Sequence, residues 1–278
     1  MGYSQRNRGD DRDRLRLAVR LFGALALLLV VVGGTPTALG TDSLCGATIA
    51  GDLKLDHDVD CIGDGVIAGA DGIRIDLNGY MLRGSGTGVG IAITGRNDVS
   101  ILGGTIANFA TGVRVLASTD LDIKHNEFAG NPEGIDFQAG SIGNSVKENV
   151  FRDSTIRGIM LRSNSRENDI RNNAFINDRV GILVFGGIDN TLKQNSVSGS
   201  AVAGIRINVI ATGNALKDNI IWSNLAGIEF LVTPTGSAQG NELKGNTLSG
   251  NTCGLKGPTD GNTLKDNSYG GNTTDTCS

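Results

Sequence analysis

Charged, amide and aromatic side chains recur at fixed distances from a glycine in successive segments of this chain. The planar fork of an arginine can hold a carboxylate through two hydrogen bonds, and an aromatic ring offers an apolar platform. If the segments stack, residues at equal positions form one face. The candidates on this face for contacts with sugar hydroxyls or uronate carboxylates are Arg114, Asp136, Gln138, Arg162, Phe185, Arg206, Asn208 and Glu229.

Two columns of residues make up this face. The second residue after each glycine is Arg74, Ala92, Arg114, Asp136, Met160, Leu183, Arg206, Glu229 and Lys256, and the fourth is Asp76, Thr94, Leu116, Gln138, Arg162, Phe185, Asn208 and Leu231. About nine stacked segments, spaced as β-strands are, give a face on the order of 38 Å long. Such a face suits an extended polymer such as a polysaccharide.

The charges on this face also have a purely structural interpretation. Exposed ion pairs contribute under about 1 kcal/mol, and the pairs expected on successive segments are Arg114 with Asp136 and Arg206 with Glu229. Ion pairing explains Arg162 least, because its column neighbours, Gln138 and Phe185, are uncharged. We therefore expect the loss of Arg162 to weaken the binding of an acidic glycan more than the loss of Lys217, a cation outside this face, does.

The glycines that define the columns recur at a nearly constant period. They are Gly90, Gly112, Gly134, Gly158, Gly181, Gly204, Gly227 and Gly254, each followed by Ile, Val or Leu, at steps of 22, 22, 24, 23, 23, 23 and 27 residues. A fixed period in this range indicates a solenoid of stacked repeats.

A second pattern, N-x-apolar-x-x-N, lies in the later part of each repeat. It begins at Asn144, Asn168, Asn190, Asn214, Asn241 and Asn262, and a degenerate copy without the first Asn runs from Leu121 to Asn126. Two residues beyond the last Asn of these seven copies stand Phe128, Phe151, Phe175, Val197, Ile221, Leu248 and Tyr269. Each repeat thus has three short alternating apolar segments and no helical run, which predicts three strands per coil and three parallel sheets. The repeated Asn residues are expected to bond one another as stacked ladders at the turns.

Together these motifs resemble the right-handed parallel β-helix of the pectate-lyase-like class, including the NosD-like periplasmic copper-binding proteins. The resemblance covers about residues 72–272, with coils of 22–24 residues, so residues 72–278 are expected to form the β-helix and residues 41–71 its N-terminal cap. Leucine-rich repeats share the period but require an L-x-x-L-x-L pattern.

The resemblance gives little support for catalysis. Polygalacturonate hydrolases of this class use clustered Asp residues, but the one Asp-Asp pair, Asp10-Asp11, precedes the repeats; Asn131-Pro132-Glu133-Gly134 lacks the acids of an epimerase. Only Asp136, near Arg114 and Arg162, resembles part of a calcium-dependent lyase site. No cofactor is therefore identified, and calcium is an unsupported option.

Metal and nucleic-acid ligands have little support as well. Copper requires Met, His or Cys ligands, whereas the chain has three Met and two His, His57 and His125, and its cysteines are not at C-x-x-C spacing. A net charge of −4 and a pI near 5.2 argue against a nucleic-acid partner.

A second column of like charges is expected on another face. It contains Lys124, Lys147, Arg171, Lys193, Lys217, Lys244 and Lys265, with the acids Asp122, Glu148, Asp169, Asp218, Glu242 and Asp266 nearby. This stripe is either a solvated face that discourages edge association or a stripe that binds an anionic polymer.

The N-terminal residues and the cysteines indicate export. Residues 1–40 combine an arginine-rich start, an apolar run over 21–32 and a stretch of small residues, which is typical of a cleaved secretory signal. An uncleaved membrane anchor is the alternative. In an oxidising compartment, the expected disulfides are Cys45–Cys61 and Cys253–Cys277, each of which would close one end of the solenoid.

The sequence therefore predicts a secreted β-helix that binds an extracellular or cell-wall polysaccharide, with an acidic glycan as one option. Processing of that polymer would make the protein a lyase, an epimerase or a glycoside hydrolase. The alternative is a structural or adhesive surface solenoid without a catalytic site.

Overall fold

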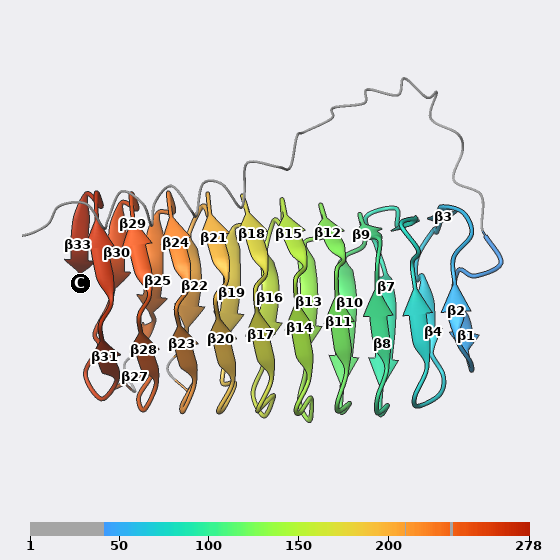
Figure 1. Ribbon diagram of the computed structural model, residues 1–278, viewed down its shortest axis with the longest axis horizontal. Helices are drawn as coiled ribbons and strands as arrows, with labels where there is room; N and C mark the ends of the chain where they lie inside the picture. The colour runs from blue at the N-terminus through green and yellow to red at the C-terminus, as the bar shows by residue number, and fades with distance from the viewer. Residues whose placement is uncertain (1–41, 209, 234–235) are drawn as a thin grey trace, which may run out of the picture. The chain divides into compact units, whose positions relative to one another are not determined.

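The computed structural model describes residues 42–278, apart from residue 209 and residues 234–235. The expected leader, residues 1–40, lies outside the described residues. In the part described, no helix is long and apolar enough to cross a membrane. The described residues form a right-handed parallel β-helix of short strands and no helix, which confirms the predicted fold (Figure 1).

Each coil contributes one strand to each of three parallel sheets. Sheet A consists of β1 (Ala47–Ile49), β4 (Val66–Ala68), β7 (Val89–Thr94), β10 (Thr111–Leu116), β13 (Glu133–Phe137), β16 (Arg157–Leu161), β19 (Val180–Val184), β22 (Ala203–Ile207), β25 (Ala226–Phe230), β30 (Cys253–Lys256) and β33 (Thr274–Cys277). Its register joins equivalent residues of successive coils, as in Val113 with Ile135 and Ile135 with Ile159.

Sheets B and C repeat this order with shorter strands. Sheet B consists of β2 (Leu53–Lys54), β5 (Arg74–Asp76), β8 (Ser100–Leu102), β11 (Asp122–Lys124), β14 (Ser145–Lys147), β17 (Asp169–Arg171), β20 (Thr191–Lys193), β23 (Ala215–Lys217), β28 (Glu242–Lys244) and β31 (Thr263–Lys265). Sheet C consists of β3 (Val59–Asp60), β6 (Met81–Arg83), β9 (Thr105–Ala107), β12 (Glu127–Ala129), β15 (Val150–Arg152), β18 (Ala174–Ile176), β21 (Ser196–Ser198), β24 (Ile220–Trp222), β29 (Thr247–Ser249) and β32 (Ser268–Gly270). A short antiparallel hairpin, β26 (Val232–Thr233) with β27 (Gly236–Ser237), follows β25.

The interior is a continuous column of aliphatic and aromatic side chains. Phe128, Phe151 and Phe175 are fully buried, and their rings stack with centroids 4.7 Å apart and planes within 5° and 6° of parallel. This confirms the predicted core column, which arises because parallel in-register strands place identical side chains directly above one another.

Asparagine ladders satisfy the polar groups at the corners of the coil. In the ladder between sheets B and C, buried Asn195 accepts from Asn173 at 3.1 Å and donates to Asn219 at 3.0 Å and to the carbonyl of Ile170 at 2.8 Å. The second predicted ladder, between sheets A and B, is formed in the same way from Asn144 to Asn262. Both predicted ladders are therefore confirmed.

A third ladder, at the corner between sheets C and A, was not predicted. It contains Asn131, Ser154, Asp178, Ser200, Asn224, Asn251 and Asn272, each five residues after an Asn of the ladder between sheets B and C. That spacing is the sequence signal for it. The mixture of Asn, Ser and Asp at this position hides the signal in a search for repeated Asn alone.

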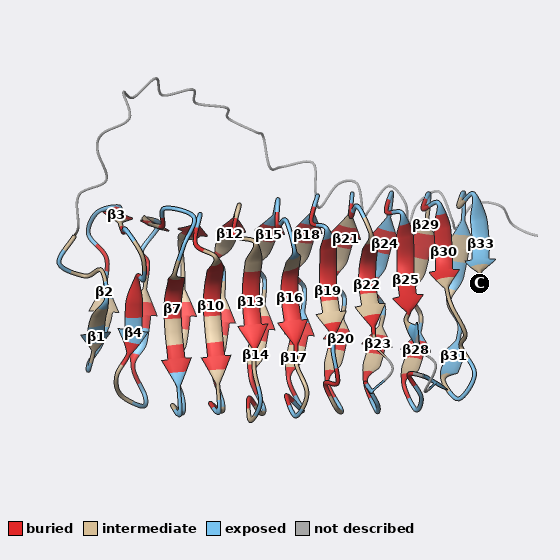
Figure 2. Ribbon diagram, turned by 180° about the vertical axis from the view of Figure 1, so that it is seen from behind, coloured by how far each residue is buried: buried red, intermediate tan, exposed pale blue. Residues whose placement is uncertain are grey.

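Both predicted disulfides are present, Cys45–Cys61 at the N-terminal end and Cys253–Cys277 at the C-terminal end. The last coil has no neighbour on its outer side, so Leu264 and most of β31 and β33 are exposed (Figure 2). Within the expected cap segment, β1 to β3 form the first coil of the stack and β4 begins the second.

One part of the predicted register is wrong. Arg74 and Asp76 lie on β5 in sheet B, and the residue that pairs with Ala92 in sheet A is Ile67 of β4. The reason is that Gly72 has a positive φ of 66° and forms a turn, whereas Gly65 is the glycine that begins the sheet A strand of that coil.

Candidate functional site

The candidate residues lie on the outer face of sheet A, because side chains alternate along each strand. Val113 and Val115 of β10 are buried in the core, and Arg114 between them points outward. Strand pairing puts Arg114 opposite Asp136, and the same column continues through the pairs Asp136–Met160, Met160–Leu183, Leu183–Arg206, Arg206–Glu229 and Glu229–Lys256. The structure gathers these residues into two charged groups with an apolar coil between them.

The first charged group is built around Asp136, whose side chain is only 2% exposed. Arg162 donates from Nε to Oδ1 of Asp136 at 2.7 Å, and Gln138 donates from Nε2 to Oδ2 at 2.9 Å. The hydrogen bond to Asp136 raises the pKa of Arg162 above its usual value. The expectation that Arg162 lacks an opposite charge is therefore wrong, because its long side chain reaches diagonally to a carboxylate on the preceding coil.

Glu133 and Arg157 complete this group and were missed in the sequence. Arg157 approaches Glu133 from Nη2 to Oε1 at 2.8 Å, and Nη2 of Arg162 lies 4.0 Å from Oε2 of Glu133. Nη1 of Arg157 also contacts the sulfur of Met160 at 2.7 Å. Each of the two residues immediately precedes a repeat glycine, and opposite charges at that position on successive repeats are the available sequence signal.

Arg114 is the arginine of this group that forms no ion pair with any carboxylate of the described residues. Although it stands opposite Asp136 in the register, Asp136 is already bonded by Arg162 and Gln138. Its Nε is buried and has no hydrogen-bond partner. Three arginines and two carboxylates therefore meet here, with formal charges that sum to +1, and Arg114 carries the uncompensated charge.

An apolar coil separates the two charged groups. Leu183 of β19 and Phe185, which follows that strand, point outward, and Phe185 is 39% exposed. The exposed Ile210 lies close by, because it contacts the position that a side chain at Gly186 would occupy. The surface thus changes from arginine-rich to aromatic within two coils.

The second charged group consists of Arg206, Glu229 and Lys256. Glu229 is buried and accepts from Arg206 at 2.5 and 2.6 Å and from Lys256 at 2.9 Å. Asn208, two residues beyond Arg206, is half-buried and lies after the end of β22. Here two cations share one carboxylate, so this group also has a formal charge of +1.

The predicted lysine stripe lies on the outer face of sheet B, away from these groups. Register pairs Lys124 with Lys147 and continues through Arg171, Lys193, Lys217, Lys244 and Lys265. Asp122 bridges Lys124 at 2.5 Å and Lys147 at 3.0 Å. Partial burial tends to raise the pKa of Asp122. The hydrogen bonds from these two lysines lower it by more, so the pKa lies below its usual value. The expected compensation is also present at Asp169, which pairs with Arg171 at 3.2 Å, and at Glu242, which pairs with Lys217 at 2.7 Å. Glu148 instead pairs with His125 at 3.2 Å.

A comparison with known protein families shows to which family the chain belongs. Residues 71–276 match the family described as periplasmic copper-binding protein (NosD). The chain belongs to the NosD family. No curated protein matches it in sequence.

Three solved structures of similar fold have low sequence identity to this NosD family member. An alginate lyase from Paenibacillus sp. str. FPU-7 is 15% identical, with a TM-score of 0.65 over 81% of this chain and 90% of the other. The periplasmic alginate epimerase AlgG is 18% identical, with a TM-score of 0.62 over 73% of this chain and 61% of the epimerase, so the match spans about three fifths of the epimerase. An exopolygalacturonase from Thermotoga maritima is 12% identical, with a TM-score of 0.51 over 68% and 51%. At these identities the likeness establishes the fold alone.

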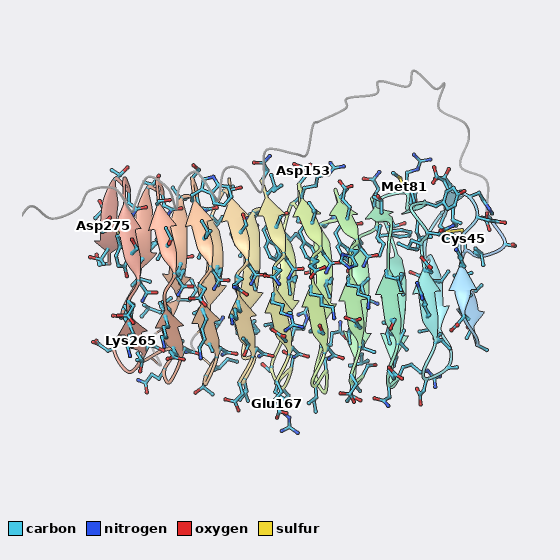
Figure 3. All side chains as sticks on the ribbon, viewed as in Figure 1. Cys45, Met81, Asp153, Glu167, Lys265 and Asp275 are labelled. Atoms are coloured by element: carbon cyan, nitrogen blue, oxygen red, sulfur yellow. A yellow bond between two sulfur atoms is a disulfide. The ribbon has the colours of Figure 1, made fainter. Side chains whose placement is uncertain are left out.

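The copper ligands that the family description implies are not brought together among the residues that the structure describes. Copper prefers thiolate, thioether and imidazole ligands. All four cysteines are in disulfides. Met81, labelled in Figure 3, lies on sheet C and Met160 lies on sheet A, and His57 and His125 lie on different coils. Within residues 42–278, apart from the three undescribed positions, no group of three His, Cys, Asp or Glu could hold a metal. These residues do not fit a copper site, and copper has no role in the function that we propose.

Proposed function

We propose that this protein is an exported β-helix that binds an acidic polysaccharide along the outer face of sheet A. The observation that carries the proposal is Arg114, a half-buried cation on this face that forms no ion pair with a carboxylate of the described residues. A uronate carboxylate supplies the bidentate acceptor that a guanidinium lacks there.

The remaining residues of the face fit a chain of sugars. Arg157 and Arg162 are each held by a carboxylate, so their positions are fixed before a ligand arrives. Fixed donors lose less conformational entropy on binding than free side chains do. Phe185, on the coil next to β16 along the stack, offers an aromatic surface for the apolar face of a sugar ring.

The length of the face also favours a polymer over a small ligand. From β10 to β30 the column of outward residues crosses seven coils of sheet A, with cationic groups at both ends and Phe185 between them. At about 4.8 Å per coil, this span is on the order of 29 Å. Among the solved structures of the same fold are an alginate lyase and an alginate epimerase, both named for an acidic polysaccharide.

Binding is better supported than turnover. Removal of a proton next to a uronate carboxylate needs a cation that neutralises the carboxylate and a free base beside it. Arg114 meets the first need, but Asp136 and Glu133 are both engaged by arginines, and His57 and His125 lie outside sheet A. Lyase, epimerase or hydrolase activity would require a base other than these groups.

Export is part of the same proposal. Two disulfides indicate folding in an oxidising compartment, and the matching family is described as periplasmic. We propose that residues 1–40 act as the secretory signal that takes the chain there.

The test is a binding screen of the purified chain against alginate, polygalacturonate and hyaluronan, with dextran as a neutral polymer of similar length. The account expects at least one acidic polymer to be retained and expects retention to fall as salt is added. The same reactions are assayed for new reducing or unsaturated ends, which would show turnover. Failure to retain any acidic polymer would leave the structural or adhesive alternative in its place.

A further inference from the structure

The C-terminal half of sheet C presents an outer surface without charge. From β18 to β32 the outward residues are Ala174, Ile176, Ser196, Ser198, Ile220, Trp222, Thr247, Ser249, Ser268 and Gly270. The corner that follows these strands continues with Asn177, Gly199, Ser223, Gly250 and Gly271, also uncharged. Earlier coils of the same sheet carry Arg83, Glu127 and Arg152. In a chain with 19% charged residues, such a strip requires an explanation.

Trp222 lies at the centre of this strip. It is the one tryptophan in the sequence, it points outward from β24, and its side chain is 36% exposed. Its partners in the register on the two flanking coils are Ser198 and Ser249. Because both neighbours are short, no long side chain of its own column covers the indole face.

Aliphatic side chains extend this platform. Ile220 lies two residues before Trp222 on the same strand and is 43% exposed, and Ile176 lies two coils away in the column of Trp222 and is 39% exposed. Hydroxyls of Ser196 and Thr247 flank Ile220 in the same way that Ser198 and Ser249 flank Trp222. Large apolar side chains therefore alternate with hydroxyl groups over a flat sheet.

We propose that this surface, centred on Trp222, is a binding site for a neutral glycan, separate from the acidic-polymer site on sheet A. A sugar ring has an apolar face of C–H groups, which stacks on an aromatic ring, and an edge of hydroxyls, which bond serine and threonine. The absence of charge on the strip disfavours a uronate or phosphate polymer. It favours a glycan whose only polar groups are hydroxyls or amides.

A second copy of the chain is the less suitable occupant. The exposed parts of Trp222, Ile220 and Ile176 offer on the order of 200 Å² of apolar surface, well below the roughly 800 Å² per partner of a stable protein interface. A single sugar chain needs only a narrow strip of the kind that one column of strands provides.

The single tryptophan makes the proposal directly testable. We would titrate the full chain with cellohexaose, N-acetylchitohexaose, mannohexaose and laminarihexaose in 0.5 M salt, which suppresses charge-driven binding, and follow tryptophan emission. At least one neutral hexasaccharide should shift or quench the emission in a saturable manner. No saturable change with any of the four would overturn the proposal.

Calorimetry on variants distinguishes this site from the site on sheet A. For the hexasaccharide that binds, Trp222→Ala should weaken affinity about tenfold, whereas Trp222→Tyr should keep most of it. Arg114→Gln should leave this affinity unchanged, and Trp222→Ala should leave binding to an acidic polymer unchanged. Equal affinity of wild type and Trp222→Ala would contradict the proposal, as would concentration-dependent dimerisation abolished by Trp222→Ala, which would identify a second copy as the occupant.

Discussion

Asp136 stands directly opposite Arg114 in the register of sheet A, yet the hydrogen bonds to its carboxylate come from Arg162 and Gln138. Arg114, the register partner of Asp136, therefore forms no ion pair with it. Arg162, on the next coil, neutralises this buried carboxylate. This arrangement separates two roles that are usually combined in one ion pair. Arg162 stabilises the fold, and Arg114 remains available to a ligand.

Stability measurements should distinguish these roles. Arg162→Gln should lower the free energy of unfolding by about 1–3 kcal/mol, because buried Asp136 loses its charged donor. Arg114→Gln should change it by less than about 0.5 kcal/mol, since no partner is left unsatisfied. Urea unfolding of both variants is the measurement. Equal losses would mean that Asp136 depends on both arginines.

The phenylalanine column should be intolerant of truncation. Phe151 is fully buried and stacks on Phe128 and Phe175 at 4.7 Å on either side, so Phe151→Ala leaves a cavity that rigid strands cannot close. The expected loss is about 3–5 kcal/mol in denaturant unfolding. Phe185→Ala, which removes an exposed ring of the same size, is the matched control and should cost far less. A loss below about 1 kcal/mol for Phe151→Ala would be incompatible with this core.

The ladder asparagines should matter through hydrogen bonding rather than through volume. Asn195→Leu removes the acceptor for Asn173 and the donor to Asn219 and to the Ile170 carbonyl. We expect a loss of about 1–3 kcal/mol, because these buried groups are then unsatisfied. Thr191→Leu, an outward position on the same coil, serves as the control. If Asn195→Leu unfolds at the same urea concentration as wild type, the ladder contributes nothing to stability.

Asp178 takes the place of an asparagine in the third ladder. Its Oδ1 accepts from the amide of Ser154 at 2.8 Å, but its Oδ2 has no partner. At the equivalent position Asn224 donates to the carbonyl of Val197, a bond that an ionised carboxylate cannot make. Burial, with a smaller contribution from Asp153 on the preceding coil, raises the pKa of Asp178 to about 7. Burial therefore favours the protonated form of Asp178, in which Oδ2 carries a donor hydrogen as the side-chain amide of Asn224 does.

This carboxyl should make stability depend on pH. Its pKa is 3.8 when unfolded and about 7 when folded, so the folded state binds more protons between these values. The contribution of Asp178 is complete below about pH 4 and is lost as pH rises to about 7. Asp178→Asn should therefore raise the free energy of unfolding by about 1–3 kcal/mol at pH 8 and change it little at pH 4.

Urea unfolding at pH 4 and pH 8 measures this effect. Asp266→Asn, at an exposed turn position, is the control and should show no difference between the two conditions. The same gain from Asp178→Asn at both pH values would show that Asp178 is ionised throughout.

The sequence was sufficient for the fold because a parallel solenoid converts a period directly into neighbours. The glycine spacing placed Arg114 opposite Asp136 and Arg206 opposite Glu229, and both are register partners in the structure. Arg206 and Glu229 also form the expected ion pair, whereas Arg114 and Asp136 do not. The phenylalanine column of the core could be predicted in the same way, because residues at equal positions of successive coils lie directly above one another. The two disulfides could be predicted because the cysteines of each pair are close in sequence and lie at the same end of the stack.

The sequence was less informative about the site, because long side chains do not stay in their columns. Arg162 reaches one coil back and two positions along the strand to Asp136, a diagonal that column-by-column comparison does not consider. Glu133 and Arg157 precede the repeat glycines, at a position that most coils fill with small or apolar residues. Only atomic positions show that these side chains converge.

The most direct test of the central claim is the affinity of the chain for a defined hexauronate, measured by calorimetry at low and high salt for wild type, Arg114→Gln and Lys217→Gln. Lys217, which pairs with Glu242 at 2.7 Å on sheet B, provides a matched loss of one positive charge away from the proposed site. The account predicts that Arg114→Gln weakens binding about tenfold while Lys217→Gln changes it less than about twofold, and that salt weakens binding of the wild type. Equal small losses from both substitutions would indicate diffuse charge attraction and contradict the claim, and so would a wild-type chain that binds no hexauronate.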